Sequence, residues 1–286
     1  MDWSYLTLCI LNTNFSYTAT ILNIVAICVI MKTSPLSRNF KTLLLSLAVS
    51  DLGIGLLAQP IFVAYLAMDS TQANETNKTY SVIYIMTLIP VKLFLFASLF
   101  SVTALCADRF LAIHLHLRYQ ELVTYKHIAI AVISIWVMSA LISLIRLFIP
   151  KNIMHVVFIV IFSACIINVT SLNVKLYLTL RCHINQNQVP QVAQTVQWES
   201  VQRRRKSAMA SLFVYLVFIV CYLPHICSLF IIAAISEPRI QVQRLQFYTI
   251  TLPFLNSTLN PLIYGWRMKQ TGNTIMNKLR VLRDNW

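Results

Sequence analysis

The chain has 286 residues, 58% of them apolar and only 11% charged, and its mean hydropathy is +0.69. This composition excludes an ordinary soluble globule, and four glycines and nine prolines exclude a collagenous or linker-rich chain. The net charge of +14 would suit a nucleic-acid-binding protein, but the basic residues are distributed between apolar blocks. The sequence therefore predicts an all-α polytopic membrane protein that binds no nucleic acid.

Seven apolar stretches are long enough to cross the ~30 Å hydrocarbon core of a bilayer. The first is the most polar of them, because residues such as Asn12, Asn14 and Ser16 interrupt it. The predicted spans, in chain order, are residues 4–31, 40–67, 80–113, 127–149, 153–180, 207–235 and 242–264. A transporter or channel is a competing class, but no internal repeat relates the two halves of the chain, and no metal-spaced or nucleophile–base set indicates an enzyme.

The basic residues predict the orientation in the membrane. Of the 23 Lys and Arg, 17 fall on one side of the predicted spans and four on the other, while Lys92 and Arg146 lie inside spans. Because cytoplasmic segments carry the excess of positive charge, an odd number of spans puts the amino terminus outside and the carboxyl terminus in the cytoplasm. The first five residues lack a basic region and a cleavage site, so no cleaved signal peptide is expected. The acceptors Asn74 and Asn77 then lie in the first exterior loop and are candidates for glycosylation.

Polar residues inside the spans are the first pointers to function, since an ionisable group at bilayer depth must face the interior of the bundle. Asp51 lies in the middle of the second span, and other spans carry polar residues at compatible depths. They are either the lining of one hydrated cavity, with Asp51 as a sodium site, or an interhelical hydrogen-bond cluster. The residues that accompany Asp51 are Asn23, Ser98, Asn256, Ser257 and Asn260.

Four motifs occur in specific spans: Asp108–Phe110 at the end of the third, Trp136 in the fourth, Cys221–Pro224 in the sixth and Asn260–Tyr264 in the seventh. Together they resemble the rhodopsin-like G-protein-coupled receptors over essentially the whole chain. The resemblance implies a seven-transmembrane receptor domain over residues 1–265 in the plasma membrane. Its partners would be an extracellular ligand and a heterotrimeric G protein, with no cofactor beyond a sodium ion. Residues 266–286 would form a short amphipathic cytoplasmic helix.

The resemblance also implies a switch between two packings of the helices. Pro224 and Pro261 should kink the last two spans, and Arg109 can exchange Asp108 for other partners. Relatives often hold the closed state with an acid in span six, but here the matching residue is Arg204, which predicts signalling without ligand. The predicted switch residues are Asp108, Arg109, Tyr177, Phe218, Tyr222, Pro224, Pro261 and Tyr264.

Departures from the family pattern resemble the melanocortin receptors and their adenosine and cannabinoid relatives. Tyr84 replaces the usual cysteine of span three, and Val169 replaces the usual proline of span five. The acids that melanocortin receptors use for calcium and basic peptide are also missing, so a melanocortin peptide is not the expected ligand. Val91 in place of an aspartate disfavours amines, and Phe254 in place of a lysine excludes retinal.

Cations inside the spans instead favour an anionic or lipid-like ligand. Lys92, Arg146 and His225 are predicted to face or flank one cavity with no acid at that depth. Alternatively, Lys92 and Arg146 extend to the exterior headgroups and His225 is an interior hydrogen-bonded residue.

The cytoplasmic face resembles a docking site for a partner helix. Leu117 and Tyr119, together with Arg109, correspond to the segment that touches the G protein in the family. The carboxyl-terminal tail has few hydroxyl side chains, only Thr271 and Thr274, which predicts weak recruitment of arrestin.

Overall fold

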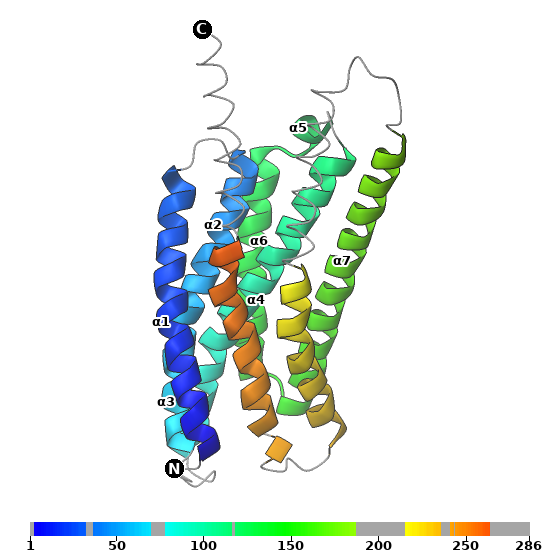
Figure 1. Ribbon diagram of the computed structural model, residues 1–286. Coiled ribbons are helices and arrows are strands. Elements are labelled where there is room, and N and C mark those ends of the chain that lie inside the picture. Colours follow the sequence, from blue (N-terminus) through cyan, green and yellow to red (C-terminus); the bar gives the residue numbers. More distant parts are fainter. Residues whose placement is uncertain are drawn as a thin grey trace.

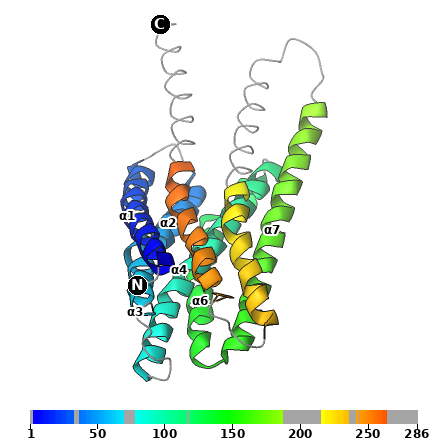
Figure 2. The same ribbon diagram turned by 60° about the horizontal axis from the view of Figure 1, so that its bottom comes forward.

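The computed structural model describes residues 3–32, 37–69, 78–115, 118–186, 215–235, 241–242 and 244–263. Within these ranges the regular structure is helical, and the long helices stand side by side as one bundle (Figures 1 and 2). The elements are α1 (Trp3–Lys32), α2 (Arg38–Gly53), η1 (Ile54–Ala58), α3 (Gln59–Asp69), α4 (Lys78–His114), α5 (Tyr119–Leu122), α6 (Tyr125–Leu144), η3 (Ile145–Leu147), α7 (Lys151–Gln186), and two further helices at 215–234 and 244–263.

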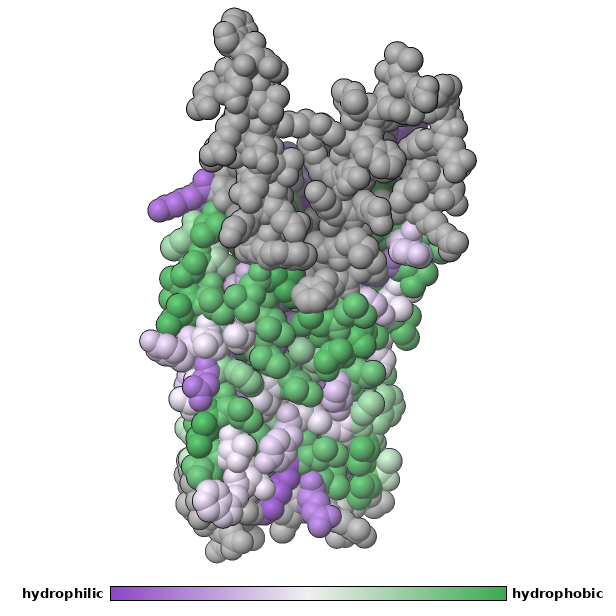
Figure 3. Space-filling view, viewed as in Figure 1, coloured by the Kyte–Doolittle hydropathy of each residue, from purple (hydrophilic) through white to green (hydrophobic). Residues whose placement is uncertain are grey.

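Seven of these rods correspond to the seven predicted spans, with α2, η1 and α3 forming the second. Six are long and apolar enough to cross a membrane. The helix at 244–263 is less apolar because it carries residues such as Gln246, Asn256 and Asn260. Apolar side chains cover much of the bundle face seen in Figure 3. They are exposed there because the bilayer, rather than water, is the solvent for this surface.

In Figure 1, α1 begins at the lower end of the bundle, and the helix at 244–263 runs upward from that same end, parallel to α1. This arrangement is what an odd number of crossings requires. The chain is thus organised as a seven-helix membrane bundle, as predicted. The proposed amphipathic helix at 266–286 lies outside the described residues.

Helix α4 occupies the centre of the bundle, packing against α2, α6 and α7. Small polar groups tie these helices together: the Trp136 indole donates to Ser46 Oγ at 3.3 Å, and Ser46 Oγ lies 3.1 Å from Ser101 Oγ. Such bonds let helices associate in lipid, where apolar burial alone provides no driving force between them.

The second span contains a turn with i→i+5 geometry at η1. There the Ser16 hydroxyl of α1 donates to the Gly55 carbonyl at 2.6 Å. A Cβ on Gly55 would lie 2.8 Å from Thr20 Oγ1 and 2.9 Å from the Thr20 nitrogen, so only glycine admits this approach of the two backbones. The wide turn therefore lies at a contact between the first and second spans. A hydropathy profile does not predict such a turn.

A second polar cluster lies at the end of the bundle where α1 begins. Tyr5 of α1 donates its hydroxyl to Asp69 Oδ2 at 2.7 Å, and the Tyr65 hydroxyl lies 3.5 Å from Oδ1 of the same carboxylate. The Arg244 guanidinium lies 5.6 Å from the centre of the Tyr5 ring. These contacts connect the first, second and seventh spans at this end.

Candidate functional site

The structure brings Asp51 together with two of the polar residues predicted to accompany it. Ser98 Oγ of α4 donates to Asp51 Oδ1 at 2.8 Å, and Asn260 Nδ2 donates to Oδ2 at 2.8 Å. Asp51 is completely buried. Because both oxygens accept a hydrogen bond, the carboxylate joins the second, third and seventh spans.

The remaining members of the predicted polar set lie beside this group. Asn23 Nδ2 donates to the Ser257 carbonyl at 3.0 Å, which attaches α1 to the last helix. Asn256 Nδ2 and Ser257 Oγ are buried and have no hydrogen-bond partner within the part of the chain that the structure describes. A carboxylate with nearby hydroxyl and amide oxygens is a donor set that suits a hard cation such as sodium.

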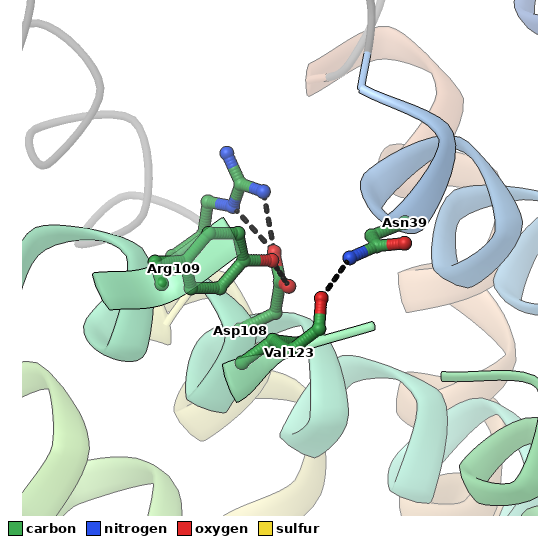
Figure 4. Close-up of polar contacts among 5 residues, drawn as sticks. Asn39, Asp108, Arg109 and Val123 are labelled. Atoms are coloured by element: carbon green, nitrogen blue, oxygen red, sulfur yellow. Dashed lines mark hydrogen bonds and ion pairs between the residues drawn. The ribbon is translucent and has the colours of Figure 1, made fainter. Parts of the chain in front are cut away.

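At the opposite end of α4, Asp108 and Arg109 form an ion pair that a third residue completes. Arg109 Nε donates to Asp108 Oδ2 at 3.0 Å, and its Nη2 donates to the same oxygen. Tyr119 of α5 donates its hydroxyl to Asp108 Oδ1. Figure 4 shows Arg109 turned toward Asp108, with Asn39 bonded to the Val123 carbonyl nearby at 2.7 Å. The carboxylate again has both oxygens bonded, and α5 is held against α4 through it.

The Arg109 guanidinium also lies over the ring of Phe40, 3.9 Å from its centre. Phe40 is buried near the start of α2. A guanidinium over an aromatic face is attracted by the ring quadrupole. Arg109 is therefore held from two sides, by Asp108 along its own helix and by Phe40 from the neighbouring one.

Tyr119, predicted as a contact for a G protein, is engaged with Asp108 in this structure. Burial, followed by the hydrogen bond to Asp108 and its negative charge, raises the pKa of the Tyr119 hydroxyl to about 12. Because this pKa is higher in the folded protein, the protonated hydroxyl contributes to the free energy of unfolding. That contribution is complete below the ordinary pKa near 10 and is lost as the pH rises from there to about 12. The hydroxyl is consequently a proton donor at physiological pH.

The other predicted switch residues are distributed along the fifth, sixth and seventh spans. Phe218 stacks on Tyr222 with ring centres 4.5 Å apart, and both are buried, six and two residues before Pro224. Tyr177 lies on α7 with half of its side chain exposed, and among the described contacts none joins it to Arg109. Pro261 is buried in the last helix.

A cavity opens between α3, α4 and the last helix, enclosing about 410 Å³ of free space with its mouth included. Val91 and Lys92, both predicted as ligand-pocket residues, line it. Four aromatic residues form much of its wall. The lining is completed by Thr87, Leu88, Gln246 and Ile250 beside the aromatic residues Phe62, Tyr65, Tyr84 and Phe247. Phe254, another predicted pocket residue, lies behind this wall with its ring centre 5.6 Å from that of Phe62.

Lys92 is the one cation among the described lining residues of this cavity. It is 4% exposed, its Nζ has no hydrogen-bond partner in the described ranges, and the nitrogen lies 4.5 Å from the centre of the Phe158 ring. His225 is also buried; its Nδ1 lies 3.4 Å from Thr249 Oγ1, whereas its Nε2 has no partner among described residues. Lys92 therefore does not extend to the exterior surface, in contrast to the alternative of a headgroup contact.

Several predicted residues cannot be placed. Arg146 lies in η3, but its side chain is outside the described part of the chain, so its position relative to Lys92 stays a prediction. The same holds for residues in loops and at the end of the receptor domain, namely Asn74, Asn77, Leu117, Arg204 and Tyr264.

The contacts of Phe40 and Phe158 were not predicted from the sequence. Both residues lie in apolar stretches, where a phenylalanine has the same pattern whether it packs against a leucine or receives a cation. A search for an aromatic partner of each cation inside a span could have found them. A cation buried in a span without an acid needs an aromatic face or a carbonyl.

Comparison with known proteins defines the class to which this bundle belongs. Residues 22–264 match the 7 transmembrane receptor (rhodopsin family), and the chain is therefore a member of that family of G-protein-coupled receptors. It is 24% identical to adenosine receptor A3 of Ovis aries over 299 aligned positions, which cover 96% of this chain and 90% of that receptor. It is also 24% identical to melanocortin receptor 3 of Homo sapiens over 266 positions, covering 88% and 79%.

These matches confirm the predicted resemblance to rhodopsin-like receptors and to the adenosine and melanocortin groups within them. The chain is a multi-pass membrane protein of a receptor family whose members are not enzymes.

Proposed function

We propose that this protein is a plasma-membrane receptor that converts binding of an extracellular, anionic or lipid-like ligand into activation of a heterotrimeric G protein. The observation that carries the proposal is that one helix, α4, contains both Lys92 in the cavity and Arg109 in the ion pair. Seventeen residues at 1.5 Å each separate them by about 25 Å along a continuous helix. A ligand that displaces α4 at the cavity would thus act directly on the Asp108–Arg109 pair.

The cytoplasmic side is inferred from the charge distribution, with the amino terminus outside. Lys32 ends α1, and Arg38 and Lys41 lie in the first turn of α2, at the end of the bundle where Arg109 lies. Removal of N-glycans should shift the mobility of the wild-type receptor and not that of a double variant with Asn74→Gln and Asn77→Gln. A tag at the amino terminus that is accessible only after permeabilisation would contradict the orientation.

The lining of the cavity favours an anionic ligand over the alternative of a peptide of the melanocortin type. The described lining holds a lysine and no acid, so a basic peptide would find no counter-charge.

Receptor function is tested without knowing the ligand. The purified receptor in lipid nanodiscs is mixed with members of each main G-protein class, and nucleotide exchange is compared with exchange by the Arg109→Ala variant. Because Arg204 occupies the position of the usual restraining acid, we expect basal exchange in the wild type and its loss in the variant. No difference between the two with any G protein would contradict the proposal.

We also propose that Asp51 holds a sodium ion that favours the inactive packing. Ser98 and the buried Ser257 hydroxyl would contribute further oxygens. A ligand shifts two states only by its differential affinity for them, so sodium should lower basal nucleotide exchange in the wild type. Replacing potassium by sodium should have no effect in Asp51→Asn. An equal sodium response in that variant would exclude the site.

A further inference from the structure

Lys92 is a buried cation whose hydrogen-bonding capacity is unused. An ammonium carries three donors, and within the described residues Nζ has no acceptor. The Phe158 ring, 4.5 Å away, attracts the charge but accepts no conventional hydrogen bond. A buried charge that is neither paired nor hydrogen-bonded is unfavourable, so a group that supplies an acceptor here gains more than it would at the surface.

A second unused nitrogen, His225 Nε2, is connected to Lys92 by a series of ring contacts. Phe96 contacts Phe158, which carries Lys92, at 5.4 Å between ring centres, and it contacts Phe162 at 5.0 Å. Phe162 in turn meets the His225 ring edge-to-face at 6.0 Å. Lys92 Nζ and His225 Nε2 therefore border one aromatic cluster between α4, α7 and the helix at 215–234.

The stem of Lys92 also lines the cavity, whose opposite wall is aromatic. Phe62, Tyr65 and Phe247 pack edge-to-face, with Phe62 and Tyr65 lying 6.0 and 5.9 Å from Phe247. Tyr84 lies 5.6 Å from Tyr65. Such a wall buries a flat or alkyl body.

We propose that this cavity binds a monocarboxylate with an apolar body, its carboxylate on Lys92 and its body against the aromatic wall. The proposal deepens the proposed function and rests on it only for the direction from which the ligand arrives. The acid can reach the site from water, as an aryl carboxylate, or from the bilayer, as a fatty acid.

The acid at the outer end of the bundle does not neutralise Lys92. Asp69 accepts the Tyr5 hydroxyl at 2.7 Å and lies 3.5 Å from the Tyr65 hydroxyl, so it belongs to the cluster that closes the first, second and seventh spans. Its contact with Tyr65 places it behind the aromatic wall of the cavity. Asp69 therefore does not compete with the anionic group of the ligand for Lys92.

The test measures binding to purified receptor in nanodiscs by thermal stabilisation, with potassium salts so that a sodium effect is excluded. Phenylacetate represents the aqueous source and octanoate the bilayer source, each compared with its amide. We expect one or both acids to raise Tm and their amides to do so at least tenfold less effectively, because the amide removes the charge-assisted bond. Phenylacetate alone would indicate an aqueous ligand, and octanoate alone a lipid one.

Variants assign the effect to the cavity. Lys92→Met should lower the affinity for the acid at least tenfold and Lys92→Arg less, while the exposed Lys126→Met should not change it. Phe247→Ala should weaken binding, in contrast to Phe148→Ala, whose side chain is 83% exposed. Equal stabilisation by acid and amide, undiminished binding to Lys92→Met, or no stabilisation by either acid at millimolar concentration would each overturn the proposal. Basal nucleotide exchange needs no ligand, so failure of the carboxylate proposal would leave the proposed receptor function intact. A receptor that binds the acid but shows no basal exchange would contradict the receptor function and leave the carboxylate site intact.

Discussion

Two buried carboxylates, Asp51 and Asp108, and two buried basic groups, Lys92 and His225, differ in how far the protein itself satisfies them. Asp51 and Asp108 each have both oxygens hydrogen-bonded by side chains of the protein. Lys92 Nζ and His225 Nε2 are as deeply buried, yet neither has a hydrogen-bond partner among the described residues. The two carboxylates hold the resting packing together, whereas Lys92 and His225 are satisfied only when something else supplies an acceptor.

The largest effect is expected at Asp51. Asp51→Ala leaves the Ser98 hydroxyl and the Asn260 amide buried without their acceptor, at a cost of about 2–5 kcal/mol in the free energy of unfolding. Thermal unfolding in detergent measures this directly. Asp51→Asn keeps one acceptor oxygen and should lose less. If Asp51→Ala unfolds at the wild-type temperature, the contrast between the satisfied and unsatisfied sites does not hold.

The next effect is expected at the Asp108–Arg109 ion pair. Tyr119→Phe removes the hydroxyl that donates to Asp108 while keeping the ring. A hydrogen bond to a charged group contributes about 1.5–3 kcal/mol, and since Tyr119 is only half-buried we take about 1 kcal/mol, or roughly a fivefold rise in basal nucleotide exchange. Tyr125→Phe is the matched control, because it retains the ring on which Arg38 lies, 3.8 Å from its centre. Equal exchange in the two variants would refute the restraining role of Tyr119.

Substitution of Lys92 should change the stability of the receptor in the opposite direction to substitution of Asp51. Lys92→Met replaces an unpaired buried charge by an apolar side chain of similar size, so the receptor without ligand should become more stable by about 1 kcal/mol after the lost attraction to Phe158 is subtracted. The measurement is Tm in ligand-free buffer. A lower Tm would mean that Lys92 has a partner in the resting state and would remove the contrast with Asp51.

The smallest effect is expected at Phe40. Phe40→Leu keeps an apolar side chain but removes the face over which the Arg109 guanidinium lies. A partly exposed cation–π contact contributes about 0.5–1 kcal/mol, so basal exchange should rise roughly two- to fivefold. Phe40→Tyr retains the ring and should behave as wild type. A rise in both variants would attribute the effect to packing at the start of α2 instead.

The sequence predicted the seven spans because the bilayer requires about 20 apolar residues for each crossing. It also predicted which residues accompany Asp51, since polar side chains at equal depth have few alternatives to one another. It did not predict the contacts of Arg109 with Phe40 or of Lys92 with Phe158. Those depend on the relative rotation and height of two helices, which apolar periodicity along either one does not determine.

The wide turn at η1 has a consequence for how the second span presents its outer half. One additional residue in a helical turn rotates everything beyond it by about 100° relative to an uninterrupted α-helix. Phe62 and Tyr65, which lie after this turn, reach the cavity from that rotated frame. The contact between Gly55 and Ser16 thus fixes the orientation of the aromatic residues of the cavity, although neither residue lines it. The first span therefore determines the rotation of the outer half of the second span about its axis. Deleting one residue from 54–58 would turn Phe62 and Tyr65 away from the cavity while leaving Asp51 in place.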